Sequence, residues 1–249
     1  MKANCIIYAC DSYEEGIYKK GRIRLWYENR PPADVAPTLY LRRTELIAFK
    51  YEEKYGLACG NQGKVIVEPC YDDICFAKEF LTKDGTVWEY IFVVRAGKWG
   101  VVSSNEHCQL PLEYESVQSL ELGGFLYFMV QKQGKWAVLD AAGRVKIDFR
   151  YDEIGCYMPE CMEAVQESDF FWVGNYTDRR KIGIINSDFM MTVPMVLSDT
   201  PRLVKPYKLG CYFTIQSGRQ YGLIDAQGQI VFALEGTKKD VLSKLREKK

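Results

Sequence analysis

The most reactive combination of side chains in this sequence is the single histidine, His107, beside Cys108. A cysteine next to a histidine suggests nucleophilic catalysis by a thiolate. Neighbouring residues of a strand point to opposite faces of a sheet, however, so these two side chains are not expected to meet. We therefore interpret His107 as a solvated turn residue and Cys108 as a core thiol that packs as a small hydrophobic group.

Cysteine pairs with four intervening residues form a second candidate for chemistry. Structural zinc sites usually space their ligands by about two to four residues and bring four of them together. A separation of five residues divides the two thiols of each pair between opposite faces of a straight strand, and the odd total of nine cysteines suits free thiols in a reducing compartment. We expect neither a metal nor a cofactor. The pairs are Cys5/Cys10, Cys70/Cys75 and Cys156/Cys161.

Two acidic pairs, Asp72/Asp73 and Asp152/Glu153, could act as general acid and base or bind Ca²⁺. Both pairs fall at the same position of a repeated pattern. A residue that is needed once in an active site has no reason to recur, whereas a residue that caps a turn or pairs a strand does. We therefore interpret these carboxylates as structural.

The repeated pattern is clearest at Gly97-Lys98-Trp99-Gly100-Val101-Val102, which recurs as Gly134-Lys135-Trp136-Ala137-Val138-Leu139. Three looser copies extend it, with a spacing of roughly 40 residues, which is typical of solenoids, propellers and arrays. Each copy is anchored by an aromatic or apolar residue followed by a small one. The anchors are Tyr55-Gly56, Trp99-Gly100, Trp136-Ala137, Ile182-Gly183 and Tyr221-Gly222.

Each copy predicts a three-stranded antiparallel meander. An apolar run precedes the anchor, as in residues 90–94 and 125–130, and such runs are typical of buried strands. The anchor opens a second strand, and a Gly- or Asn-containing turn leads to a third. In three copies the third strand ends in an aromatic-acidic signature, after which we expect a variable loop. The signature tyrosines are Tyr71, Tyr114 and Tyr151.

These motifs resemble a named family. Lys-Trp-Gly-Val-Val, then Asp-x-x-Gly-Arg, a short strand and Tyr-Asp-x-Ile are similar to the bacterial WG repeat, also called the KWG repeat, over residues 46–236. This chain departs from the family with Tyr55, Tyr221 and Ile182 for the tryptophan and with Ala137 for the glycine. The fourth copy also lacks the Tyr-Asp signature. The resemblance implies a bacterial β-repeat protein and transfers no catalytic residues.

The predicted fold is all-β, with tandem meanders stacked as a solenoid-like array; a closed propeller-like ring is the alternative. Residues 46–236 form five repeats. Residues 1–45 form an N-terminal β segment, either a degenerate capping unit or an unrelated β extension. Residues 237–249 form a tail whose short helix places Val241, Leu242 and Leu245 on one face. We expect this helix to cover the open end of the array, with partner docking as the alternative.

Composition excludes several classes of function. Lysine plus arginine and aspartate plus glutamate each number 33, and no long block of one charge occurs. This balance argues against nucleic-acid binding, which usually needs a basic stripe. No apolar run approaches the roughly 18 residues that span a bilayer, and the apolar stretch at the N-terminus is too short for a signal peptide. We expect a cytoplasmic protein without membrane insertion.

The leading functional hypothesis is a non-catalytic protein-interaction or scaffold module whose partner is another protein. Loops carry function more often than scaffolds do, and we expect the long inter-repeat loops at residues 75–89 and 155–169 to bind the partner through Phe80, Trp88 and Tyr157. Trp99 and Trp136 could form an aromatic platform, but their repetition favours a core position between repeats.

Two alternatives stay open. One is a bacterial defence protein that neutralises a toxin, which a surface patch of a single charge would favour. The other is an enzyme whose site lies in the inter-repeat loops, in a pocket lined by residues such as Tyr157, Glu160 and Asp178.

Overall fold

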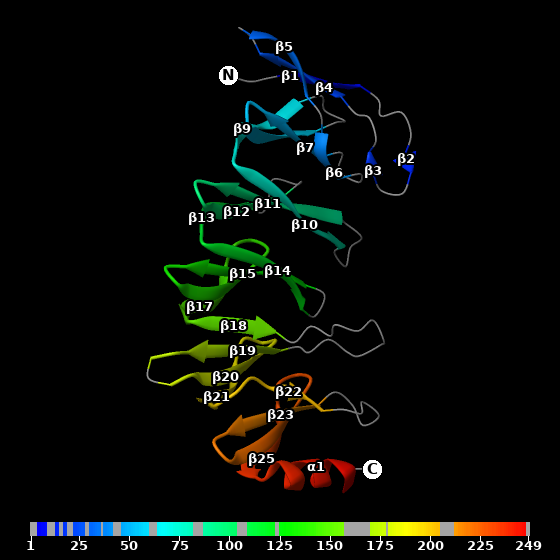
Figure 1. Ribbon diagram of the computed structural model, residues 1–249. Coiled ribbons are helices and arrows are strands. Elements are labelled where there is room, and N and C mark those ends of the chain that lie inside the picture. The colour runs from blue at the N-terminus through cyan, green and yellow to red at the C-terminus, as the bar shows by residue number, and fades with distance from the viewer. Residues whose placement is uncertain are drawn as a thin grey trace. The chain divides into compact units, whose positions relative to one another are not determined.

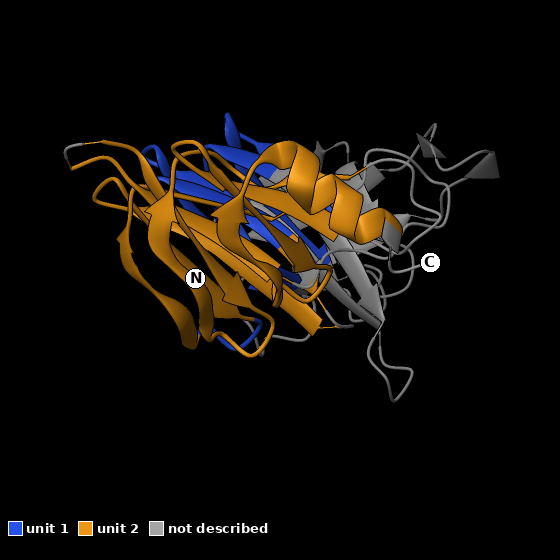
Figure 2. Ribbon diagram, turned by 90° about the horizontal axis from the view of Figure 1, so that it is seen from below, with its two compact units in different colours: residues 1–119, 141–143 blue, residues 120–140, 144–249 orange. Residues whose placement is uncertain are grey.

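The computed structural model describes the backbone of most of the chain, and the chain divides into two compact units (Figure 2). Unit 1 comprises residues 1–119 and 141–143, and unit 2 comprises residues 120–140 and 144–249. The described residues are 4–8, 13–14, 17–18, 22–27, 30–35, 37–41, 46–59, 64–81, 87–103, 109–122, 125–156, 170–177, 179–204 and 212–247.

A seven-stranded antiparallel sheet contains the first repeat together with most of the N-terminal segment. Its strands, in spatial order, are β5 (Arg30–Val35), β4 (Arg22–Tyr27), β1 (Asn4–Tyr8), β9 (Lys64–Tyr71), β8 (Lys54–Cys59), β7 (Leu46–Tyr51) and β6 (Pro37–Leu41). A separate pair is formed by β2 (Tyr13–Glu14) and β3 (Ile17–Tyr18). Because β6 pairs with β7, the first repeat begins inside residues 1–45, the segment predicted to be either a degenerate capping unit or an unrelated β extension.

Four further sheets have four strands each, connected in sequence order (Figure 1). The first is β10 (Asp73–Leu81), β11 (Val87–Arg95), β12 (Lys98–Ser103) and β13 (Gln109–Tyr114). The second is β14 (Ser116–Leu122), β15 (Phe125–Lys132), β16 (Lys135–Asp140) and β17 (Val145–Tyr151). The third is β18 (Glu153–Cys156), β19 (Phe170–Asn175), β20 (Lys181–Asn186) and β21 (Met191–Leu197). The fourth is β22 (Arg202–Leu203), β23 (Tyr212–Ser217), β24 (Gln220–Asp225) and β25 (Ile230–Gly236).

The all-β prediction is confirmed, but each meander has four strands where the sequence predicted three. The additional strand begins one or a few residues after the end of the previous sheet, as β10 does after Tyr71 and β18 after Tyr151. These residues were expected to form the variable loop. Hydrogen bonding to the apolar strand that follows converts them into an edge strand, since an extended segment beside an unpaired strand satisfies its backbone groups there.

The sheet of β18–β21 is buried on both faces within unit 2, which explains its continuous apolar runs. Phe171, Val173 and Ile185 pack against the sheet of β14–β17. Phe170, Ile182 and Ile184, which alternate with them along the strands, pack against the sheet of β22–β25. Successive sheets of unit 2 therefore share their cores. Within unit 1, Ala48, Leu57 and Tyr71 of the seven-stranded sheet likewise pack with Val93 of β11.

The C-terminal tail forms helix α1 (Lys238–Glu247), as predicted, and packs on the last sheet (Figure 1). Thr237 caps it: the Thr237 hydroxyl and N–H donate to the carboxylate of Asp240, and the Asp240 N–H donates back to the hydroxyl. This reciprocal arrangement is the capping box, and it satisfies helix N–H groups that lack a partner inside the helix. Val241 and Leu245 are buried against Leu223 of β24. Among the described residues, no helix is long and apolar enough to cross a membrane.

Candidate functional site

The anchor residue of each repeat lies directly opposite the last residue of the strand that follows it in the chain. Trp99 pairs with Tyr114, and Trp136 pairs with Tyr151. The two rings differ in burial: Tyr151 is 2% exposed, whereas Trp136 is only half-buried beside the core shared by two sheets. Trp136 thus lies at the edge of the core, and the tyrosine of the signature is the buried member of the pair.

The same register holds in the other repeats, including the fourth, which lacks the signature. Tyr55 pairs with Tyr71, Ile182 with Leu197, and Tyr221 with Gly236. The register therefore depends on the backbone pattern of the repeat and does not require an aromatic pair.

The small residue after each anchor lies at a β-bulge. Trp99 pairs with Tyr114, and Val101 pairs with Leu110, so that the facing strand β13 carries extra residues at this point. A Cβ atom added to Gly100 would lie 2.7 Å from the carbonyl oxygen of Leu110. The facing backbone approaches too closely for a side chain, which explains glycine in this position.

Gly56 and Gly222 show the same close approach, with carbonyl oxygens of Val67 and Phe232 at 2.8 Å from an added Cβ. Ala137 occupies the equivalent position in the third repeat and is fully buried, so that bulge accommodates one methyl group.

The acidic residue after the signature tyrosine joins one sheet to the next. Asp152 accepts a hydrogen bond from Lys135 of its own repeat at 2.5 Å and another from the backbone N–H of Tyr176, in the hairpin of the next sheet, at 2.8 Å. The Asp152 N–H also donates to the Gly174 carbonyl at 2.9 Å. The carboxylate thus has the capping role that its repetition predicted.

Unit 1 contains the same junction. Asp72 pairs with Lys54 and accepts the N–H of Ala96 at 2.5 Å, while its own N–H donates to Val94 at 2.7 Å. Hydrogen bonding from Lys54, and then from the Ala96 N–H, holds the pKa of Asp72 below its usual value. The Lys135 and Tyr176 bonds lower the pKa of Asp152 in the same way.

A second ionic junction lies beside Asp152. The guanidinium of Arg180 forms a two-point contact with Glu153, at 2.8 and 3.1 Å, and lies 3.8 Å from Asp199. Asp199 follows β21 at the place where Glu153 follows β17. Arg180 therefore lies between the corresponding carboxylates of two successive sheets, and planar two-point pairing of this kind fixes geometry well.

The turn between the last two strands of each sheet has a recurrent form in unit 2. The side-chain oxygen of Asp140, Asn186 or Asp225 accepts the N–H of the residue four positions later, at 2.8–2.9 Å. Gly143 and Gly228 take positive φ angles of 76° and 74° in this turn. Phe189 takes their place in the fourth repeat with a φ of 61°, which is unfavourable for a bulky residue.

The ring of Phe189 contacts aromatic residues from two sheets of unit 2. It stacks on Phe171, with ring centroids 6.0 Å apart, and meets the edge of Tyr127 at 5.5 Å. The position that repeats 3 and 5 fill with glycine therefore contributes to a core in repeat 4.

Of the residues predicted to bind a partner from loops, Phe80 and Trp88 lie on strands. Phe80 is in β10 and Trp88 is in β11, directly opposite one another. The prediction of a loop is thus wrong for residues 75–81 and 87–89, because β10 pairs with β11 there.

Other predicted residues lie outside the described residues: Tyr157, Glu160, Asp178, His107, Cys108, Cys10 and Cys161. Cys70 is a half-buried thiol in β9, and burial raises its pKa. Among the described side chains, no three His, Cys, Asp or Glu residues converge as metal ligands would.

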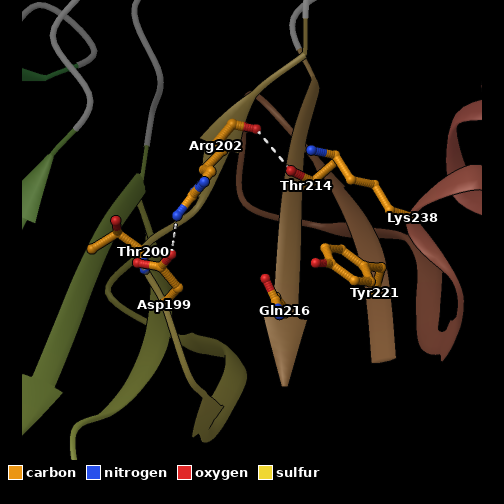
Figure 3. A pocket seen from close by; sticks show the side chains of 7 residues that line it. All are labelled: Asp199, Thr200, Arg202, Thr214, Gln216, Tyr221 and Lys238. Atoms are coloured by element: carbon orange, nitrogen blue, oxygen red, sulfur yellow. Dashed lines mark hydrogen bonds and ion pairs between the residues drawn. The ribbon is translucent and has the colours of Figure 1, made fainter. Parts of the chain in front are cut away.

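The sequence did not predict a small polar pocket that the structure places in unit 2 (Figure 3). It lies between the junction after β21, strands β22–β24 and the first residue of α1. Its lining carries two cations, one carboxylate, two hydroxyl groups, an amide and a phenol. These belong to Arg202, Lys238, Asp199, Thr200, Thr214, Gln216 and Tyr221.

Hydrogen bonds organise one side of this pocket. Arg202 pairs with Asp199, and the Thr200 N–H donates to the same carboxylate at 2.9 Å. Partial burial by itself raises the pKa of Asp199, but the bonds from Arg202 and Thr200 outweigh it and hold the pKa below its usual value. Asp199 therefore stays ionised and its charge is balanced by Arg202. Lys238 has no such carboxylate partner among the described residues.

Comparison with known proteins adds little to this description. Neither a known protein family nor a curated protein matches this sequence. A solved structure titled as the crystal structure of the eukaryotic initiation factor is similar at 9% identity and a TM-score of 0.35, covering 94% of this chain and 74% of that chain. A protein of unknown function from Bacteroides caccae is similar at 10% identity and a TM-score of 0.26, covering 94% of each chain. These scores are too low to support an argument about function.

Proposed function

We propose that this chain is a bacterial WG-type repeat protein that acts as a non-catalytic protein-interaction or scaffold module. The proposal rests on one observation: within a repeat, the motif residues have structural roles that the hairpin-turn residues do not share. Trp136, Tyr151 and Asp152, which define the motif, contribute to strand register, core packing and the junction between sheets. The residues of the hairpin turns differ between repeats, and we assign the recognition of a partner to them.

The proposal includes an open, solenoid-like arrangement of the repeats. Its support comes from the last sheet of unit 2, whose two faces are both covered. One face shares a core with β19–β21, and the other packs under α1 through Val241 and Leu245. In a closed ring the second face would pack against the first repeat. A terminal helix in that place is typical of the caps that end open repeat arrays.

Affinity capture tests the proposal. The tagged full chain is incubated with lysate of its source organism under reducing conditions, at low and high salt, and crosslinked partners are identified by mass spectrometry. A surface variant with Lys181→Glu and Arg219→Glu changes two exposed residues at hairpin turns. Asp188→Asn, which removes an exposed charge at the opposite end of the strands, is the matched control.

We expect wild type and Asp188→Asn to capture a stoichiometric partner. The double variant should lose this partner, and its melting temperature should equal that of wild type. Capture that yields no stoichiometric partner under either salt condition contradicts the proposal and directs attention to a substrate screen.

The toxin-neutralising alternative is a special case with one favouring observation: exposed cations gather at the hairpin turns of unit 2, at Arg179, Lys181 and Arg219. A partner that is toxic when expressed alone, and harmless when co-expressed with this chain, would support it. Co-expression that leaves the toxicity unchanged contradicts it.

A further inference from the structure

We propose that the polar pocket beside Lys238 binds a carboxylate side chain of an acidic protein segment, and that the neighbouring turns extend the contact. The inference rests on the proposed function and names the chemistry of the partner. It starts from the balance of charge in the pocket, where Arg202 and Lys238 face a single anion, Asp199. One entering carboxylate makes the pocket electrically neutral.

The donors of the pocket suit a carboxylate. Asp199 engages one nitrogen of Arg202, and Lys238 carries three N–H groups with no described carboxylate partner. Figure 3 shows the hydroxyl oxygen of Tyr221 on the side of the ring that faces Gln216. Charge-assisted bonds from ammonium and guanidinium groups to a carboxylate are about twice as strong as neutral ones.

Tyr221 gives this pocket a hydroxyl group that the anchors of the second, third and fourth repeats lack; the anchor of the first repeat, Tyr55, is also a tyrosine. Tyr221 is the anchor of the fifth repeat, at the place where the second and third repeats have Trp99 and Trp136. A phenol brings a hydroxyl donor where tryptophan presents a larger apolar ring. Because its lining also includes Lys238 of α1, the pocket belongs to the last repeat and is not a general property of the motif.

Exposed cations flank the pocket on the neighbouring turns. Lys181 precedes Ile182, which pairs with Leu197, and so lies beside the junction that leads to Asp199. Arg219 lies in the turn between β23 and β24, which the pair Ser217 and Gln220 closes, two residues before Tyr221. Backbone and side-chain bonds from Ser198 and Ser217 tie these two places together.

Lys181 and Arg219 form what we call the basic edge, and no carboxylate pairs with either of them among the described side chains. A segment with several acidic residues can thus place one carboxylate in the pocket and others along the basic edge. Glu153 and Asp199 interrupt the cations, which disfavours a continuous phosphate backbone and favours spaced carboxylates.

The test uses the full chain and a fluorescein-labelled oligoglutamate peptide, with binding measured by fluorescence anisotropy. Lys238→Gln removes the pocket ammonium, and we expect it to weaken binding about fivefold. Lys239→Gln is the matched control, because it removes the same charge from the next residue of α1, which does not line the pocket. We expect this control to stay within about twofold of wild type. Melting temperatures confirm that both variants fold.

Equal effects of Lys238→Gln and Lys239→Gln overturn the pocket assignment, since they would reflect overall charge alone. Tighter binding of an oligothymidylate than of oligoglutamate overturns the protein-segment assignment in favour of a nucleic acid. This inference is overturned if oligoglutamate does not displace the captured partner and Lys238→Gln still binds that partner fully. The proposed interaction function would be unaffected by that result. Absence of any captured partner is instead the failure of the proposed function.

Discussion

Asp152 accepts a hydrogen bond from the backbone N–H of Tyr176, 24 residues later in the chain, at 2.8 Å. One carboxylate oxygen thereby fixes the hairpin of the following sheet, while the other holds Lys135 of its own sheet at 2.5 Å. Asp72 makes the corresponding pair of contacts with Ala96 and Lys54. The acidic residue of the motif therefore connects one repeat to the next.

Asp152→Asn should lower the free energy of unfolding by about 1 kcal/mol. An amide keeps one acceptor but loses the charge that strengthens the bonds to Lys135 and Tyr176, and both groups are partly solvated, which limits the loss. Urea unfolding monitored by tryptophan fluorescence measures the change. Asp188→Asn, at an exposed turn, is the control and should change stability by less than about 0.5 kcal/mol. Equal losses in the two variants would contradict the junction role.

Stability should fall when the pH drops below about 4. The folded-state pKa values of Asp72, Asp152, Asp199 and Asp240 lie below the ordinary aspartate value of about 3.9. The unfolded chain then binds protons before the folded chain does, so these groups stabilise the fold above that value and lose their effect as pH falls through the lowered range. Melting temperatures between neutral and acidic pH measure this. The difference between wild type and Asp152→Asn should shrink at the acidic end; a constant difference would exclude ionised Asp152 as its source.

Gly222→Ala should destabilise the last sheet by about 1–3 kcal/mol, the usual cost of forcing an extra methyl into a packed site. The added Cβ would lie 2.8 Å from the Phe232 carbonyl oxygen, which is backbone and can move only with its strand. Gly236→Ala is the control, because a Cβ there meets its nearest neighbour at 3.4 Å, an ordinary contact. Thermal unfolding of both variants checks the prediction, and a Gly222→Ala variant as stable as wild type would contradict the close approach.

Phe189→Gly should cost only about 1 kcal/mol although it removes an aromatic ring. The ring contacts Phe171 and Tyr127, but a φ of 61° is strained for phenylalanine by about 1–2 kcal/mol, and glycine relieves that strain. Phe171→Ala is the comparison: this side chain is fully buried in an ordinary strand conformation, and its loss should cost about 3–5 kcal/mol. Similar losses in urea unfolding would show that strain at Phe189 is negligible.

Truncation after Gly236, which removes α1, should expose the outer face of the last sheet. Leu223 would lose its cover from Val241 and Leu245, and an exposed apolar sheet face promotes association. We expect a lower melting temperature, increased binding of an apolar dye, and oligomers that depend on concentration in light scattering. Val241→Asp, which keeps the chain length, should reproduce the effect. A truncated chain that stays monomeric and binds no dye would contradict the capping role.

Much of the local structure could be predicted from the sequence. The spacing of the anchors from Tyr55 to Tyr221 indicates the repeats, and the apolar runs before them locate β11, β15, β19 and β23. The terminal helix lies within residues 237–249, the tail in which the sequence predicted it. Such features depend on neighbours along the chain, because strand alternation, turn preference and helix amphipathicity are local patterns.

The candidate site was not predictable in this way. The pocket joins Asp199 and Arg202 to Tyr221 and Lys238, which belong to separate strands and a helix, and no short motif contains them. The edge strand β10 was mistaken for a loop for a related reason, since its strand character depends on the partner β11.

The sequence by itself therefore determined the repeat, three of its four strands, the turns between them and the terminal helix. Only the tertiary structure decided that Asp152 contacts the next sheet, that Phe189 occupies a glycine position, and that the polar pocket forms. The physical reason is that hydrophobic periodicity specifies which face of a strand is buried, whereas the contacts of a polar group depend on which sheet packs beside it.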